Sequence, residues 1–176
     1  SAQRLLFFVS TSLAMVERIG RRSARALRHL KLLLKDRQKR SLVRESPPGV
    51  EVIIAPSFIC LADLAVHVKG LGLDTVYLAA QDISPFPKGG YTGAIAADMV
   101  RGLADYVIAG HSERRRYFHE TVQDVVNKVH EAVDFGLRPV LCVEPAAAMA
   151  QLAPLTDIDC EKMIIAYCPV EPLTFR

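Results

Sequence analysis

Side chains able to do acid–base or nucleophilic chemistry follow several short apolar runs of this sequence. His111 and Glu113 come after the run Tyr106–Gly110, and Cys168 directly follows Met163–Tyr167. In parallel α/β folds, chemistry gathers where strands end and loops begin. Each residue also has an ordinary interpretation: His111 as a histidine satisfied at a strand end, and Glu113 as a helix cap or an ion-pair partner of the arginines after it. The residue types therefore indicate a candidate site and leave its chemistry open.

The elements that must position these residues alternate regularly along the chain. Runs rich in Val, Ile and Leu predict six buried parallel strands: Leu5–Val9, Val50–Ala55, Thr75–Ala80, Tyr106–Ala109, Pro139–Val143 and Met163–Tyr167. Helices are predicted over Ser57–Lys69, Gly93–Arg101 and Thr121–Asp134. The last is the clearest, because Thr121 and Asp124 have the spacing of a capping box. Strands that alternate with helices predict an α/β fold with a parallel sheet.

The composition is that of a globular chain, with 176 residues of which 51% are hydrophobic. It excludes a chain that is disordered or a coiled coil throughout, and no apolar run approaches the roughly 18 residues of a membrane-spanning helix. The charge is uneven: residues 1–44 carry 12 basic and 2 acidic side chains, net +10, whereas residues 45–176 carry 10 basic and 17 acidic ones, net −7. We therefore expect a basic N-terminal segment with an amphipathic helix over residues 1–49, which could be a divergent first strand and helix, before an α/β body over residues 50–176 that ends at strand six.

The basic segment has an ordinary interpretation and several functional ones. From Ile19 to Lys35 the apolar residues recur at helical spacing, which favours an amphipathic helix with a basic outer face. Binding to nucleic acid, to an anionic membrane or to a targeting receptor are the alternatives. A secretory leader is disfavoured because Ser10, Thr11 and Ser12 interrupt the early apolar run. The four cysteines form no CxxC pair, so we expect reduced thiols in a cytoplasmic protein.

The segment around His111 closely resembles the signature of the triosephosphate isomerase family. It reads Tyr106-Val107-Ile108-Ala109-Gly110-His111-Ser112-Glu113-Arg114-Arg115. Further segments match in the family's order between about residues 50 and 170: Ala55-Pro56-Ser57, Ala80-Gln81-Asp82, Gly90-Tyr91-Thr92-Gly93, Phe118-His119-Glu120-Thr121, Leu141-Cys142-Val143, and Ile165-Ala166-Tyr167 before Pro169-Val170. Several collinear matches identify the chain as a member of this family.

The resemblance implies a (β/α)8 barrel that interconverts dihydroxyacetone phosphate and glyceraldehyde 3-phosphate in glycolysis and gluconeogenesis, without a cofactor or metal ion. Moving a proton between adjacent carbons requires a carboxylate base and a donor that polarises the carbonyl oxygens. By resemblance His111 is this donor, kept neutral by a helix N-terminus, and Glu113 belongs to the catalytic network. In the family the matching loop reaches into a partner subunit, so Thr92 is a candidate contact of a homodimer, although Ala94 replaces a usual acidic residue there.

The chain departs from the family at three places. Cys168 stands where the family has its catalytic glutamate, and a thiol with a reference pKa of about 8.5 is mostly protonated at neutral pH. Glu171, three residues later, falls where the mobile lid begins. The family's substrate-binding asparagine and lysine correspond to Thr11 and Leu13. The sequence reaches Arg176 before a seventh or eighth strand, whose loops hold the phosphate in such barrels, so we expect an incomplete barrel of about six strands.

Two hypotheses for function remain. In the first, the chain is an isomerase of this family, although the changed residues argue against turnover by this chain alone. In the second, it is a catalytically inactive paralogue or partial product that acts as a binding or assembly module through the loop around Thr92 or the basic segment. Nucleic-acid binding by residues 18–44 is a weaker third hypothesis.

Overall fold

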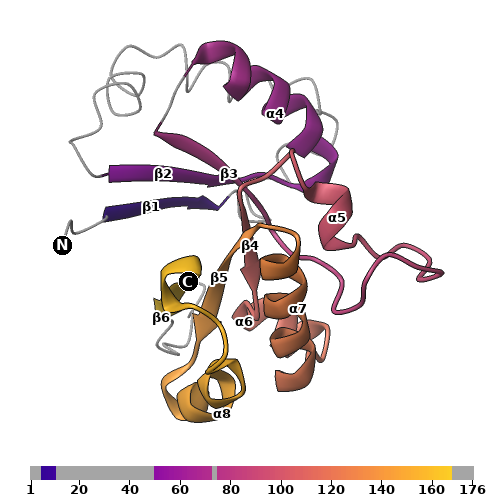
Figure 1. Cartoon of the computed structure of the whole chain (residues 1–176), viewed down its shortest axis with the longest axis vertical. Helices are drawn as coiled ribbons and strands as arrows, with labels where there is room; N and C mark the ends of the chain where they lie inside the picture. Colours follow the sequence, from indigo (N-terminus) through magenta and orange to yellow (C-terminus); the bar gives the residue numbers. More distant parts are fainter. Residues whose placement is uncertain (1–4, 11–49, 73–74, 168–176) are drawn as a thin grey trace, which may run out of the picture. The chain divides into compact units, whose positions relative to one another are not determined.

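The computed structural model describes residues 5–10, 50–72 and 75–167. The chain divides into two compact units (Figure 1). The first unit contains residues up to 81 together with residues 102–106, and the second contains residues 82–101 and those from 107 onward. The boundary therefore passes through strand β4 (Tyr106–Ala109), directly after its first residue.

The first unit contains three parallel strands in sequence order and one helix. β1 (Leu5–Ser10) pairs along its whole length with β2 (Val50–Ala55), which in turn pairs with β3 (Val76–Ala80). Helix α4 (Phe58–Leu71) connects β2 to β3. Parallel neighbours cannot be joined by a tight turn, so a crossover helix of this kind is expected between them.

The core of the first unit is almost entirely apolar. Ile53 in β2 is 0% exposed, and Leu61 in α4 is 2% exposed. Tyr106 is also fully buried, and its hydroxyl donates a hydrogen bond of 2.7 Å to Glu51 Oε2. Its ring meets that of Tyr77 edge to face, with centroids 5.7 Å apart. Apolar burial therefore supplies most of the stabilisation here.

The second unit contains the remainder of the described elements. Its strands lie in the order β4-β5-β6, and β5 and β6 are parallel. The elements after β4 are α6 (Ser112–Tyr117), α7 (Val122–Asp134), β5 (Arg138–Val143), the 3-10 helix Pro145–Ala147, α8 (Ala148–Leu152), the 3-10 helices Ala153–Leu155 and Cys160–Lys162, and β6 (Ile164–Tyr167). Helix α5 (Ala97–Val100) precedes β4. Val125 and Val129 of α7 pack with Leu141 and Val143 of β5 in one buried cluster.

Helix α7 begins as its sequence predicts. The Thr121 hydroxyl accepts a hydrogen bond from the Asp124 N–H at 3.1 Å, and the Asp124 carboxylate accepts one from the Thr121 N–H at 2.9 Å. This reciprocal pair is the predicted capping box. Hydrogen bonds from the hydroxyl and then the N–H of Thr121 lower the pKa of Asp124 below its usual value. The helix start is therefore stabilised by an ionised carboxylate.

All six predicted strands are confirmed, with ends shifted by at most one residue. Two helix predictions need correction. The helix predicted over Gly93–Arg101 is wrong for its first half, because Gly93 has φ +83° and the Ile95 carbonyl accepts a hydrogen bond from the Ser84 N–H. Only Ala97–Val100 is helical. Helix α4 runs past Gly70 to Leu71 and is capped by Gly72, whose φ of +58° suits glycine.

Two further predictions concern helices. The amphipathic helix predicted from Ile19 to Lys35 lies outside the described residues. Among the helices that the structure describes, none is long and apolar enough to cross a membrane.

Candidate active site

The candidate site is built on the junction between β4 and α6. The strand residues Tyr106–Ala109 are buried, so the polar residues begin abruptly after Gly110. Gly110 has φ +69°, and a Cβ atom there would lie 2.9 Å from Val125 Cγ1. Only glycine fits both the left-handed backbone and this close approach to α7. The turn then places His111 at the N-cap of α6.

The two ring nitrogens of His111 have different hydrogen-bonding roles. Its Nδ1 accepts a hydrogen bond from the Glu113 N–H at 3.4 Å, as an N-cap side chain does. In the neutral ring, the proton then resides on Nε2, which is left free to donate. The side chain is 41% exposed, so an outside ligand can reach it.

Glu113 lies beside His111 in the first turn of α6. Its carboxylate Oε2 is 3.7 Å from His111 Nδ1, and its side chain is 63% exposed. The two arginines that follow it pair with other carboxylates: Arg114 with Asp82 and Glu120, and Arg115 with Glu144. The structure thus brings together His111 and Glu113, two of the site residues predicted from the sequence.

Arg115 fixes the strand ends beneath this turn. Its guanidinium donates hydrogen bonds to the Gly110 carbonyl and, at 2.9 Å, to the Cys142 carbonyl at the end of β5. It also pairs with Glu144 Oε1 at 2.6 Å. Gln151 of α8 accepts a bond from the Glu144 N–H at 3.0 Å. One arginine therefore holds the backbone that precedes His111 against the next strand.

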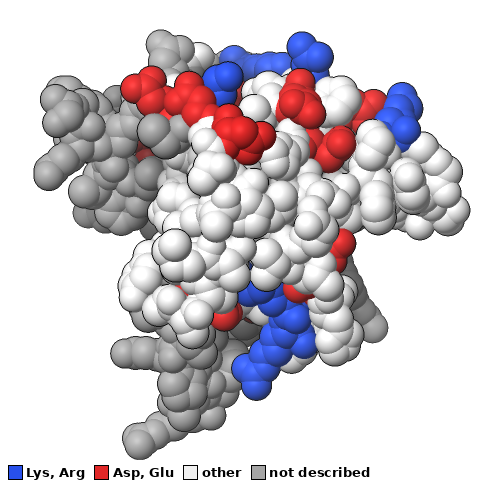
Figure 2. Space-filling view, turned by 60° about the horizontal axis from the view of Figure 1, so that its bottom comes forward, with Lys and Arg blue, Asp and Glu red and all other residues white. Residues whose placement is uncertain are grey.

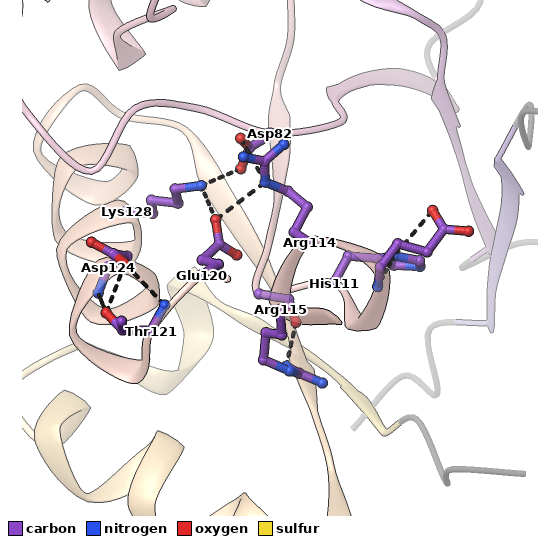
Figure 3. Close-up of polar contacts among 10 residues, drawn as sticks. Asp82, His111, Arg114, Arg115, Glu120, Thr121, Asp124 and Lys128 are labelled. Carbon is purple, nitrogen blue, oxygen red and sulfur yellow. Dashed lines mark hydrogen bonds and ion pairs between the residues drawn. The ribbon is translucent and has the colours of Figure 1, made fainter. Parts of the chain in front are cut away.

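A cluster of four charges lies on the other side of α6, as Figure 3 shows. Arg114 Nε is 2.9 Å from Asp82 Oδ2 and 3.2 Å from Glu120 Oε1. Lys128 Nζ is 2.6 Å from Asp82 Oδ1 and also pairs with Glu120 Oε1. Burial raises the pKa of Asp82 above its usual value, opposed by the hydrogen bond and charge of Lys128 and by the charge of Arg114. We call these four residues the ion cluster.

Sequence reasoning did not find the ion cluster as a unit. Asp82 and Glu120 lie in segments that match the family, but nothing in the sequence pairs them. Lys128 carries the usable signal, because it comes three residues after Val125 and four before Ala132, two buried positions of α7. A lysine on the inward side of a helix must find buried carboxylates.

Of the other two predicted site residues, the structure describes only Thr92. Cys168 lies outside the described residues, directly after β6 ends at Tyr167. Thr92 lies in an exposed loop from Phe86 to Ala94, in which the rings of Phe86 and Tyr91 stack with centroids 4.8 Å apart.

Acidic and basic side chains are interspersed on the face drawn in Figure 2. This part of the described surface shows no extended basic patch of the kind that binds nucleic acid. Residues 11–49, which hold most of the basic segment, lie outside the described residues.

Comparison with known proteins gives a consistent result. A family model described as triosephosphate isomerase matches residues 25–173. The triosephosphate isomerase of Colwellia psychrerythraea is 39% identical over 138 residues, covering 69% of this chain and 54% of that protein. That of Xylella fastidiosa strain M23 is 43% identical over 140 residues, covering 70% of this chain and 55% of that protein. The chain therefore spans about half the length of these relatives.

Proposed function

Because the chain belongs to the triosephosphate isomerase family, we propose that it carries the electrophilic half of that family's reaction. The described elements form an α/β fold that is an incomplete (β/α)8 barrel. The substrates are dihydroxyacetone phosphate and glyceraldehyde 3-phosphate, which interconvert through an enediolate. The observation that carries the proposal is the His111 ring, whose Nδ1 accepts the Glu113 N–H and whose Nε2 is left to donate.

The role of His111 follows from the charge that develops during proton transfer. Removing a proton from the carbon beside a carbonyl places negative charge on the oxygens, and a neutral N–H donor stabilises it. The turn at Gly110 and the bonds from Arg115 hold the residue before His111, so the donor is oriented before substrate binds. Glu113 fixes the ring through its N–H and is proposed to belong to the same network.

This chain differs from the family at the position of the catalytic base. The family's glutamate position holds Cys168, whose thiol has a reference pKa of about 8.5 and is mostly protonated at neutral pH. We therefore expect the chain to polarise a triose phosphate carbonyl and to transfer its proton poorly. Cytoplasmic location and a place in glycolysis and gluconeogenesis belong to the same proposal.

The test is an isomerisation assay with glyceraldehyde 3-phosphate on three proteins. Cys168→Glu restores a carboxylate and should turn over faster than the unaltered chain, although Thr11 and Leu13 still replace the family's substrate-binding asparagine and lysine. Adding His111→Gln to Cys168→Glu should remove that gain. The proposal is wrong if Cys168→Glu gives no gain, or if the gain survives without His111.

A second candidate function is assembly through the loop around Thr92. The exposed loop, stiffened by the Phe86–Tyr91 stack, favours a contact with a second copy of this chain. Light scattering should then show a dimer that Thr92→Arg dissociates, with Gln123→Arg on the exposed surface of α7 as the matched control. A monodisperse monomer of the unaltered chain would contradict this function.

A further inference from the structure

Helix α6, which carries His111, lacks an apolar anchor of its own. It is six residues long and has no buried residue. A single short helix of this length is not stable in water without tertiary contacts. Its position therefore depends on polar side chains, and the described contacts of its arginines supply them: Arg115 toward β5 and Arg114 within the ion cluster.

Arg114 is tied directly to the backbone of His111. The Arg114 N–H donates to the His111 carbonyl at 2.9 Å, and the Arg115 N–H donates to the same carbonyl at 3.2 Å. Contacts that fix the Arg114 guanidinium therefore also restrain the first turn of α6. Its partners are the carboxylates of Asp82 and Glu120.

These two carboxylates depend on Lys128. The Lys128 side chain is 2% exposed and that of Glu120 is 3% exposed, so neither charge can be left to water. Glu120 receives both cations on Oε1, and its buried Oε2 has no hydrogen-bond partner among the described residues. With Lys128 the cluster has two cations and two anions. Without it, Arg114 alone faces the buried carboxylate of Glu120 and the partly buried carboxylate of Asp82, which is strongly unfavourable.

We propose that Lys128, one helix away from the candidate site, is a positioning residue for His111 that acts through Asp82, Glu120 and Arg114. Figure 3 shows this path from α7 to the N-terminus of α6. The charge of Lys128 balances the carboxylates of Asp82 and Glu120, which bind the Arg114 guanidinium. The Arg114 main chain in turn fixes the first turn of α6, which positions the imidazole of His111. The inference deepens the proposed function, because it supposes that the position of His111 matters for the reaction.

The test measures amide hydrogen exchange at Arg114 and Arg115, the two N–H groups bonded to the His111 carbonyl. In Lys128→Met their exchange should accelerate at least tenfold relative to amides of β5. Lys128→Arg keeps the cation and should restore the slow exchange. Val129→Ala is the matched control, since it opens a cavity at the next residue of α7, which is 0% exposed, and should affect the amides of α6 and β5 alike.

A charge-balanced variant covers the case in which Lys128→Met does not fold. Lys128→Met with Glu120→Gln removes one charge of each sign and leaves Arg114 paired with Asp82. Because Arg114 then balances the one remaining carboxylate, the proposal expects exchange at Arg114 and Arg115 close to that of the unaltered protein. Unchanged exchange in Lys128→Met, faster exchange in the charge-balanced variant, or an equal acceleration relative to β5 in Val129→Ala overturns the proposal. Since no substrate is present, the result is independent of whether Cys168→Glu gains turnover.

Discussion

The two units bury different kinds of side chain. Among the described residues, the buried polar or charged ones are Ser84, Lys128 and Gln151, and all three lie in the second unit. The first unit buries apolar residues and one tyrosine, whose hydroxyl reaches the half-buried Glu51. The unit that presents His111 thus adds a cluster of matched charges to its apolar core, whereas the core of the other unit is almost entirely apolar. Removing one partner of a buried ion pair is strongly destabilising, because it leaves an uncompensated buried charge.

The largest expected effect is in the ion cluster. Glu120→Ala leaves Lys128 buried with one carboxylate fewer, and we expect a loss of about 3–5 kcal/mol in the free energy of unfolding. Tyr106→Phe in the first unit removes one hydrogen bond and should cost about 1 kcal/mol. Chemical denaturation measures both. The contrast between the units fails if Tyr106→Phe is as damaging as Glu120→Ala.

The helix starts provide a smaller contrast. Thr121→Ala removes the capping box of α7 and should destabilise the protein by about 1 kcal/mol. Ser57 at the start of α4 makes no side-chain cap bond, so Ser57→Ala should change stability by no more than about 0.3 kcal/mol. Equal effects from the two alanine variants would contradict this assignment.

The effect of Thr121→Ala should also depend on pH. Because the pKa of Asp124 is lowered in the folded state, its contribution is present above the unfolded pKa of about 3.9 and is lost as the pH falls through the folded pKa. The difference between Thr121→Ala and the unaltered protein should therefore shrink in strong acid, as denaturation curves across pH would show.

One small expected effect is a gain in stability. Burial and then the charges of Asp134 and Asp98 raise the pKa of Glu131 above its usual value. A raised pKa means that the folded state binds the proton more tightly, so stability is lost as the pH rises through that range. Glu131→Gln should stabilise the protein by about 0.5 kcal/mol at pH 7 and leave it unchanged near pH 3. A loss at pH 7, or an equal gain at pH 3, would refute this reading.

Much of the fold could be predicted from local pattern. The strands could be predicted because runs of Val, Ile and Leu are typical of buried parallel strands. Helix α7 could be predicted because Thr121 and Asp124 form a capping box within one turn. The helix before β4 was misplaced because Gly93 and the hydrogen bond between Ser84 and Ile95 decide its start. That bond joins positions eleven residues apart, beyond the spacing that a helical pattern shows.

The candidate site was predictable only in part. His111 and Glu113 are adjacent in the sequence and in space, so the motif shows them together. The ion cluster draws on Asp82, Arg114, Glu120 and Lys128 from four segments, and only tertiary structure makes them neighbours. Apart from Lys128 at an inward position of α7, its charges carry no spacing that a sequence could display.

Two histidines, one in each unit, allow the central claim to be tested in one experiment. The claim is that β4 and α6 present His111 with its proton on Nε2, ready to polarise a carbonyl. In the first unit, His67 Nδ1 lies 2.9 Å from the Asp63 carbonyl, which only accepts, so His67 must carry its proton on Nδ1.

The measurement is the nitrogen-15 NMR spectrum of the ring nitrogens in histidine-labelled protein, at a pH where both rings are neutral. We predict opposite tautomers, with the proton on Nε2 in His111 and on Nδ1 in His67. A His111 ring protonated on Nδ1, or averaged between the two tautomers, would contradict the account.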